Sequence, residues 1–146
     1  MTDSASPCTC FHLRRATRRV SQIYDHALAA VDLGVNQYSM LRRLQARPLP
    51  LGVLAEQLGM DRTTLNRNLR PLLEAGLLQE ARGDDARQRL IDLSSPGRQK
   101  LRSALPHWRQ AQRTVETLFG ASATQSLHGA LARLATRAER HLGAAP

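Results

Sequence analysis

The sequence predicts a mainly α-helical fold that carries one small β-hairpin, and three observations support this prediction. Apolar residues recur at three- and four-residue steps over most of the chain, as on the buried stripe of an amphipathic helix. Glycines interrupt these stripes where helices are expected to end, at Gly59, Gly76 and Gly120. Only residues 77–94 instead place apolar residues on both sides of a polar turn, Gly83-Asp84-Asp85.

A long first helix is expected within residues 1–34, and a shorter one follows it. The stripe of the long helix consists of Leu13, Ala16, Val20, Ile23, Ala27 and Val31. Asn36 is expected to cap the shorter helix, because an asparagine side chain accepts the free N–H groups of a first turn. The shorter helix would line any effector pocket, and it carries Tyr38, Met40, Leu41 and Leu44.

The pattern of residues 54–69 predicts two short helices joined by a turn at a glycine. Gly59 stands where the chain needs a left-handed residue to change direction. Asp61 can cap the second helix, whose buried face is expected to consist of Leu65, Leu69, Leu72 and Leu73. The opposite face carries hydroxyl, amide and guanidinium groups and no carboxylate before Glu74, which suits phosphates and base edges. The spacing predicts a helix-turn-helix, which is typical of proteins that bind duplex DNA.

The sequence after the second helix predicts a helix end, a first strand, a polar turn and a second strand. Gly76 can end the helix, and Gly83-Asp84-Asp85 marks the turn of a hairpin. Long cations near this turn could reach a minor groove or its flanking phosphates: Arg82, Arg87 and Arg89. Arginines alone would equally fit a solvated hairpin, but a hairpin directly after a helix-turn-helix favours a DNA-binding wing.

Residues 96–146 are expected to form two more helices, with an early bend at Pro106 and a break at Gly120-Ala121-Ser122. Their stripes are Leu101, Leu105, Trp108, Val115 and Leu118, and then Leu127, Leu131, Leu134, Ala138 and Leu142. The terminal stripes exceed what residues 35–95 need to cover their own core, so burial against a second copy is expected, with a monomeric bundle as the alternative. A two-fold dimer would hold its second helices about 34 Å, or a multiple of it, apart.

The charge balance favours a polyanionic partner. The 146 residues hold 21 Lys plus Arg against 12 Asp plus Glu, a formal net charge of +9, which strengthens nucleic-acid binding through counterion release. Lys100 is the sole lysine, although a GC-rich coding bias would produce the same excess of arginine. Only five aromatic residues occur, too few for the stacking platforms of single-strand and RNA binders. Double-stranded DNA is therefore the expected partner.

The expected location is the cytoplasm. No run approaches the ~18 apolar residues that a membrane span needs, and no basic stretch followed by an apolar one opens the chain. Cys8 and Cys10 are too few and too close together for a secreted disulfide framework. We expect one compact domain with no membrane partner, no cofactor and no metal.

Three segments resemble the MarR family of winged-helix regulators: Leu54-Ala55-x-x-Leu58-Gly59, then Asp61-Arg62-Thr63-Thr64-Leu65-Asn66-Arg67, then Asp85-x-Arg87 with Leu90-x-x-Leu93-Ser94-x-x-Gly97. Their order and spacing fit over residues 10–142. The resemblance implies an obligate homodimer with a body of terminal helices, which binds a pseudo-palindromic operator and is most often a repressor. It also implies that Arg87 enters the minor groove and that Asp85 shapes the wing by pairing with a neighbouring cation.

The expected contacts follow from this arrangement. Phosphate contacts are expected from Arg62, Arg70, Arg82 and Arg89, and base contacts from Thr63, Thr64, Asn66 and Arg67. Pro71 lies inside the second helix and removes the N–H that would bond to the carbonyl of Arg67, so a local bend is expected there. A large bend would alter the position of Arg70.

The segment Cys10-Phe11-x-Leu13-x-x-Ala16-x-x-x-x-x-Gln22-x-Tyr24 resembles the opening of the OhrR branch of that family, in which an equivalent cysteine senses organic hydroperoxides. A thiol in the first turn of a helix feels the positive end of the helix dipole, and Arg14 follows on the same face, so both effects favour the thiolate. Tyr24 matches one tyrosine that bonds the reactive cysteine in that branch, whereas Val35 replaces another. Cys8, its symmetry mate or a small external thiol would resolve the oxidised Cys10.

Other interpretations stay open. Cys8, Cys10 and His12 could bind a soft metal, although their alternating spacing argues against convergence, or the two cysteines could be inert. The whole chain could be a winged-helix adaptor for protein partners, or an enzyme with Cys10 as nucleophile and His12 or His26 as base, which no supporting motif favours. The expected function is a DNA-binding transcriptional regulator with no catalytic residue, released from DNA by an effector or by oxidation of Cys10.

Overall fold

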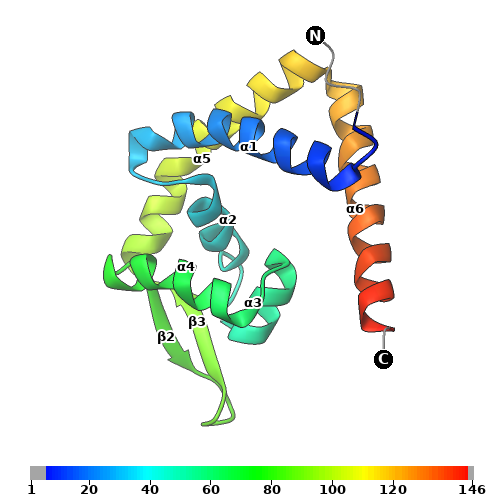
Figure 1. Ribbon diagram of the computed structural model, residues 1–146. Helices are drawn as coiled ribbons and strands as arrows, with labels where there is room; N and C mark the ends of the chain where they lie inside the picture. Colours follow the sequence, from blue (N-terminus) through cyan, green and yellow to red (C-terminus); the bar gives the residue numbers. More distant parts are fainter. Residues whose placement is uncertain (1–5, 145–146) are drawn as a thin grey trace.

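The computed structural model describes residues 6–144, which form six α-helices and a small sheet. The chain begins with α1 (Thr9–Leu28), a 3₁₀ turn (Ala29–Val31) and α2 (Val35–Arg43), and continues through β1 (Leu49–Pro50), α3 (Leu51–Leu58), α4 (Arg62–Glu74), β2 (Leu78–Arg82), β3 (Arg89–Leu93), α5 (Ser95–Phe119) and α6 (Ala121–Gly143). Figure 1 shows α1 crossing α5 at one end of the molecule and the β2–β3 hairpin projecting from the other. The predicted mainly helical fold with a wing is confirmed.

The sheet contains a third strand that the sequence did not indicate. β3 lies in the middle, with β1 on one side and β2 on the other, and both pairings are antiparallel. Leu49 of β1 lies opposite Ile91, and Leu78 of β2 lies opposite Leu93. β1 has only two residues and ends in Pro50, which lacks an N–H for further pairing. A strand of this length shows no periodicity in a sequence.

One hydrophobic core fixes the orientation of α4. The largest fully buried side chains come from α2, α3, α4, β3 and the end of α1: Leu28, Met40, Leu41, Leu44, Leu54, Leu65, Leu69, Leu72, Ile91 and Leu93. The expected buried face of α4 is thereby confirmed at Leu65, Leu69 and Leu72, while Leu73 is partly buried against the same core. Because these leucines face inward, the opposite side of α4 faces solvent.

The start of α2 differs from the expectation. Asn36 lies inside the first turn and does not cap the helix, which is preceded by Gly34. The N–H of Gly34 donates to Gln37 Oε1 at 3.0 Å, and the N–H of Val35 donates to Asp25 Oδ1 at 2.7 Å. Asp25 belongs to α1, so an acceptor from a neighbouring helix replaces the local cap that the sequence suggested.

Aromatic and polar contacts join α5 to α1, to the 3₁₀ turn and to α2. Trp108 of α5 stacks on Tyr38 of α2 with ring centroids 5.9 Å apart, and it lies 6.5 Å from the ring of Tyr24 of α1. The Tyr24 hydroxyl donates to Gln112 Oε1, and Lys100 Nζ donates to the carbonyl of Val31 at 2.9 Å. α5 therefore links the terminal helices mechanically to the winged region.

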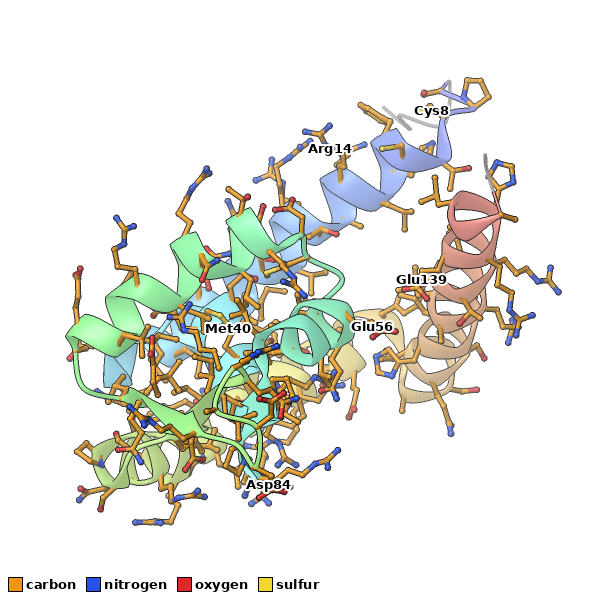
Figure 2. All side chains as sticks on the ribbon, turned by 90° about the horizontal axis from the view of Figure 1, so that it is seen from below. Cys8, Arg14, Met40, Glu56, Asp84 and Glu139 are labelled. Atoms are coloured by element: carbon orange, nitrogen blue, oxygen red, sulfur yellow. The ribbon has the colours of Figure 1, made fainter. Side chains whose placement is uncertain are left out.

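The last helix leaves its apolar stripe largely uncovered within one chain. Leu131 is 37 % exposed, Leu134 is 44 % exposed and Leu142 is 73 % exposed, and Leu118 at the end of α5 is also 73 % exposed. In both figures α6 stands apart from α2, α3 and α4 (Figures 1 and 2). The terminal helices thus carry more apolar surface than residues 6–144 of a single chain cover. None of the helices in this range is long and apolar enough to cross a membrane.

Candidate nucleic-acid interface

α4 begins at the cap that the sequence predicted. Asp61 Oδ1 accepts the backbone N–H of Thr64 at 2.8 Å, and Oδ2 accepts the hydroxyl of Thr64 at 3.0 Å. Both bonds favour the ionised carboxylate and hold the pKa of Asp61 below its ordinary value, so this cap persists as the pH falls until that lowered pKa is reached. Gly59 supplies the predicted left-handed turn with φ 64°. The angle between α3 and α4 is therefore set by local interactions.

The outward face of α4 presents the side chains expected to contact DNA. Four of them are exposed and line a shallow hollow along the helix: Thr63, Asn66, Arg67 and Arg70. α4 is a single helix from Arg62 to Glu74 that continues through Pro71, so Arg70 stays on this face. Thr64 differs, because it is half-buried and its hydroxyl is bound to Asp61. Thr64 thus holds the start of the helix.

Asp85 shapes the wing through a different partner from the expected one. Its Oδ1 accepts the backbone N–H of Arg87 at 3.0 Å, and its carbonyl oxygen accepts the N–H of Gln88 at 2.9 Å. The resemblance implied a neighbouring cation, but the structure places a backbone N–H there, as in an Asx turn. This arrangement leaves the side chains of Arg82 and Arg87 exposed on the wing. Asp84 marks the wing's outer end in Figure 2.

Arg89 connects the wing to α4. Its Nε donates to Glu80 Oε1 at 2.8 Å, and its Nη1 donates to Asn66 Oδ1 at 3.2 Å. Arg89 was expected among the phosphate contacts; it lies opposite Arg82, in the last strand pair before the turn, and its guanidinium is bound by a carboxylate. No local pattern in the sequence singles out Glu80. The two partners lie nine and twenty-three residues from Arg89 along the chain, and only the folded hairpin brings them together.

The first turn of α3 completes this cationic surface. Three arginines, Arg62, Arg87 and Arg89, line a hollow together with Gly52 and one carboxylate, Glu56. No side chain caps α3, so the N–H groups of its first turn have no acceptor within the helix. The Arg62 guanidinium lies over this turn, since a Cβ added to Gly52 would come within 3.1 Å of Arg62 Nη2. Free N–H groups beside a guanidinium are well suited to a phosphate.

Ser94 and Gly97 fasten the base of the wing to α5. Ser94 Oγ donates to the carbonyl of Gly76 and accepts the N–H of Gly97 at 3.0 Å, while the Ser94 N–H donates to the carbonyl of Leu77 at 3.1 Å. A Cβ at Gly97 would lie only 1.9 Å from the Leu77 carbonyl oxygen. The spacing Leu93-Ser94-x-x-Gly97 therefore joins the end of α4, the sheet and α5 in one contact.

A separate hollow lies between α2 and α5, with a volume of about 340 Å³. Its lining comprises Tyr38, Arg42, Gln45, Leu93, Arg98, Leu101, Arg102, Leu105 and Arg109. Arg98 is tied to Asp92 Oδ1 and to the carbonyl of Gln45, both at 3.2 Å. Burial raises the pKa of Tyr38, against the opposing effect of the nearby arginines, so its phenol is neutral at pH 7. The hollow combines a guanidinium rim with apolar walls.

The two cysteines lie far from the winged region. Both are exposed, and Cys8 caps α1 by accepting the N–H of Phe11 at 3.4 Å. In Figure 2 Cys8 and the wing residue Asp84 are at opposite ends of the molecule. Tyr24 follows Cys10 by fourteen residues on the same helix, about 21 Å at 1.5 Å per residue, so one chain does not bring them together. No metal-binding cluster, including one of Cys8, Cys10 and His12, occurs within residues 6–144.

Comparisons with known proteins agree with this geometry. A family model described as a helix-turn-helix domain matches residues 36–80. The M. tuberculosis transcriptional regulator MosR, solved in complex with DNA, is 35% identical with a TM-score of 0.82, over 91% of this chain and 97% of that one. Comparison with curated protein sequences gives no match.

Two further solved structures are similar. The transcriptional repressor CouR, bound to a 23-mer DNA duplex, is 28% identical with a TM-score of 0.81, over 92% of this chain and 97% of that one. CouR has also been solved bound to p-coumaroyl-CoA, with 26% identity and a TM-score of 0.81, over 92% of this chain and 96% of that one. A MarR variant from E. coli shares the fold at 17% identity and a TM-score of 0.76, over 84% of this chain and 89% of that one.

Proposed function

Because this chain belongs to the MarR family of winged-helix transcriptional regulators, we propose that it represses transcription by binding a pseudo-palindromic operator as a homodimer. The observation that carries this proposal is the exposed amide- and arginine-bearing face of α4 beside an arginine-bearing wing. MosR and CouR, which share the fold over almost their whole length, were both solved with DNA. Such a regulator acts at the chromosome, so we place it in the cytoplasm.

The proposed contacts divide between the grooves and the backbone. α4 enters the major groove with Thr63, Asn66 and Arg67 toward the base edges, and Thr64 supports the start of this helix. The wing places Arg87 in the adjacent minor groove. Phosphates are bound by Arg62, Arg70 and Arg82, with the first turn of α3 beside Arg62.

The terminal helices supply the dimer body in this proposal. Residues 1–34 and 96–146 carry the apolar side chains that one chain leaves exposed: Phe11, Val20, Leu118, Phe119, Leu127, Leu131, Leu134 and Leu142. A two-fold axis through this surface would present two winged regions, residues 35–95, to the same face of a duplex.

Replacing Arg87 by alanine is expected to weaken operator binding, because one cation that displaces counterions from DNA is lost. The plot of log affinity against log salt concentration should become shallower by about one unit. Fluorescence anisotropy with the intergenic duplex beside the protein's own gene measures both quantities. Arg133→Ala, which removes the same charge from α6, is the matched control. An unchanged affinity and slope in Arg87→Ala would exclude the proposed minor-groove contact of Arg87 from the binding mechanism.

Two rival functions are weaker. The relatives are transcriptional regulators rather than enzymes, and we assign no catalytic residue. Cys10 and His26 are sixteen residues apart on α1, about 24 Å, and His12 Nε2 lies 2.8 Å from the carbonyl of Ser6. An adaptor for protein partners would show no salt-sensitive, sequence-selective binding of DNA, which the same anisotropy measurement detects.

An acidic small molecule in the hollow between α2 and α5 is the proposed release signal. The rim carries four arginines, of which Arg98 is engaged by the carboxylate of Asp92. Guanidinium groups at the edge of an apolar pocket suit a carboxylate or phosphate attached to an apolar body. CouR was solved with p-coumaroyl-CoA, a ligand of this kind. The hollow lies where α5 meets the winged region, so a ligand there would bias the angle between the two.

Oxidation of Cys10 is the second candidate signal, because both thiols are exposed at the start of α1. In that scheme Cys10 forms a sulfenic acid with a hydroperoxide, and Cys8, its symmetry mate or an external thiol then closes a disulfide with loss of water. Tyr24 could reach the reactive thiol only from the partner chain.

A release assay on the preformed DNA complex separates the two signals. An acyl-CoA is expected to release wild type and Cys10→Ser equally, and to release the Arg102→Ala/Arg109→Ala double variant only at concentrations about tenfold higher or more. Cumene hydroperoxide is expected to release wild type and to leave Cys10→Ser bound. Equal release of all three proteins by the acyl-CoA would contradict the proposed pocket, and release of Cys10→Ser by the peroxide would contradict thiol sensing.

A further inference from the structure

We propose that Arg89 and Glu80 orient the amide of Asn66 so that α4 offers only hydrogen-bond donors at this position, and that each operator half-site therefore carries a guanine opposite Asn66. The inference rests on the proposed binding of α4 in the major groove and specifies which base edge one of its residues selects. Arg89 and Glu80 are then positioning residues, and Asn66 is the residue that touches the base.

The geometry of three side chains carries the inference. Arg89 Nη1 donates to Asn66 Oδ1 at 3.2 Å, and Arg89 Nε donates to Glu80 Oε1 at 2.8 Å. Glu80 and Arg89 also form an ion pair. Because one guanidinium bonds both Glu80 Oε1 and Asn66 Oδ1, the wing determines which end of the Asn66 amide is turned toward the exposed face of α4.

The backbone that carries Arg89 belongs to the sheet. β3 is its central strand, and the side chains of Ile91 and Leu93 are buried, with exposed fractions of 0 % and 1 %. Arg89 is the first residue of β3 and lies opposite Arg82, and Glu80 lies opposite Ile91 on the same strand pair. The guanidinium therefore approaches Asn66 from a paired strand rather than from the turn itself.

The chemistry of the amide gives the base preference. An asparagine that reads adenine needs both ends of its amide, since its oxygen accepts from N6 and its nitrogen donates to N7. In this structure the oxygen is turned toward Arg89, from which one of its two lone pairs accepts, so aligning both ends of the amide with an adenine edge would pull the oxygen away from Arg89, and the NH₂ group remains to face a base. Guanine presents two acceptors, O6 and N7, on its major-groove edge, whereas thymine presents one and cytosine a donor.

The ion pair with Glu80 limits what the charge of Arg89 itself contributes. Because the carboxylate offsets the guanidinium, the pair as a whole adds little to phosphate binding, and the hydrogen bond to Asn66 Oδ1 rather than net charge carries the base preference. The arrangement thus serves base selection better than the uniform phosphate contact expected from the sequence.

Selection from a randomised duplex library tests the proposal and does not require the operator to be identified first. Wild type is expected to enrich guanine at one position of each half-site, and Asn66→Ala should lose the preference at that position alone. Arg89→Met keeps the apolar stem of the side chain but frees the Asn66 oxygen. It should shift the ratio of guanine to adenine there by about tenfold toward adenine. Arg82→Met, across the strand pair, is the matched control and should leave that ratio unchanged.

Two results would overturn the inference. The first is adenine at the Asn66-dependent position in wild type. The second is an Arg89→Met protein that binds every sequence more weakly, with a salt dependence reduced by about one unit and unchanged base preferences, as a phosphate contact would. Glu80→Gln keeps an acceptor for Arg89, so it should shift the ratio of guanine to adenine at the same position less than Arg89→Met does. It also supplies a second test of the inference if Arg89→Met does not fold. If wild type enriches no sequence at all, the proposed function itself fails.

Discussion

Leu131→Glu is expected to turn the dimer into a monomer and to lower operator affinity by about 100-fold or more. Leu131 lies in the middle of the exposed stripe of α6, between Leu127 and Leu134. Two-fold symmetry would bury a new carboxylate from each copy in an apolar interface, and the cost of removing these charges from water disfavours association. A monomer can engage only one half-site at a time and loses the effective concentration that links the two, about 100- to 10,000-fold in affinity.

Light scattering coupled to size-exclusion chromatography reports the mass, and anisotropy reports the affinity. Thr136→Glu adds the same charge five residues further along α6, on the side of the helix away from the stripe. It should remain dimeric and bind DNA like wild type. A Leu131→Glu protein that stays dimeric with full affinity would place the dimer interface elsewhere.

The sequence predicted those parts of the DNA-facing surface that are determined locally. The leucine spacing of α4 identified its buried face, and therefore its exposed one, because a helix of 3.6 residues per turn has only one stripe to bury. Asp61 and Gly59 act on residues within four positions of themselves, so their roles were readable from the chain alone. The wing turn was readable for the same reason.

Several of the features that the sequence missed depend on segments that meet only after folding. Asp25 replaces the expected Asn36 cap because α1 packs beside the start of α2. Arg89 was grouped with the phosphate contacts because an arginine near a wing fits that role, and nothing local reveals its bond to Asn66. β1 was missed because two residues carry no pattern. Tertiary partners decide these roles, and a single sequence does not identify tertiary partners.

The role of the Ser94-x-x-Gly97 spacing was only partly predictable from the sequence. Ser94 is recognisable as the cap of a following helix, and it does accept the N–H of Gly97. Nothing in the sequence explains a glycine at the third helical position, where other residues would form a better helix. Its reason is the carbonyl of Leu77, which occupies the space that a side chain would need.

Gly97→Ala is accordingly expected to lower the free energy of unfolding by about 3 kcal/mol. The added Cβ would lie 1.9 Å from the Leu77 carbonyl oxygen, and that oxygen is backbone that also accepts the N–H of Ser94. Relief requires α5 to move away from the sheet, which weakens the contact between wing and body and should also reduce operator affinity.

Urea denaturation followed by circular dichroism, at one protein concentration because subunit association contributes to stability, measures this loss. Gly129→Ala is the matched control. Gly129 lies within α6, and its added Cβ would meet only the end of the flexible Arg133 side chain, at 3.3 Å. There alanine should raise stability by about 0.5–1 kcal/mol through helix propensity. The same substitution is thus expected to act with opposite sign at the two glycines. Equal stability of Gly97→Ala and wild type would mean that Leu77 and α5 are not in contact as described.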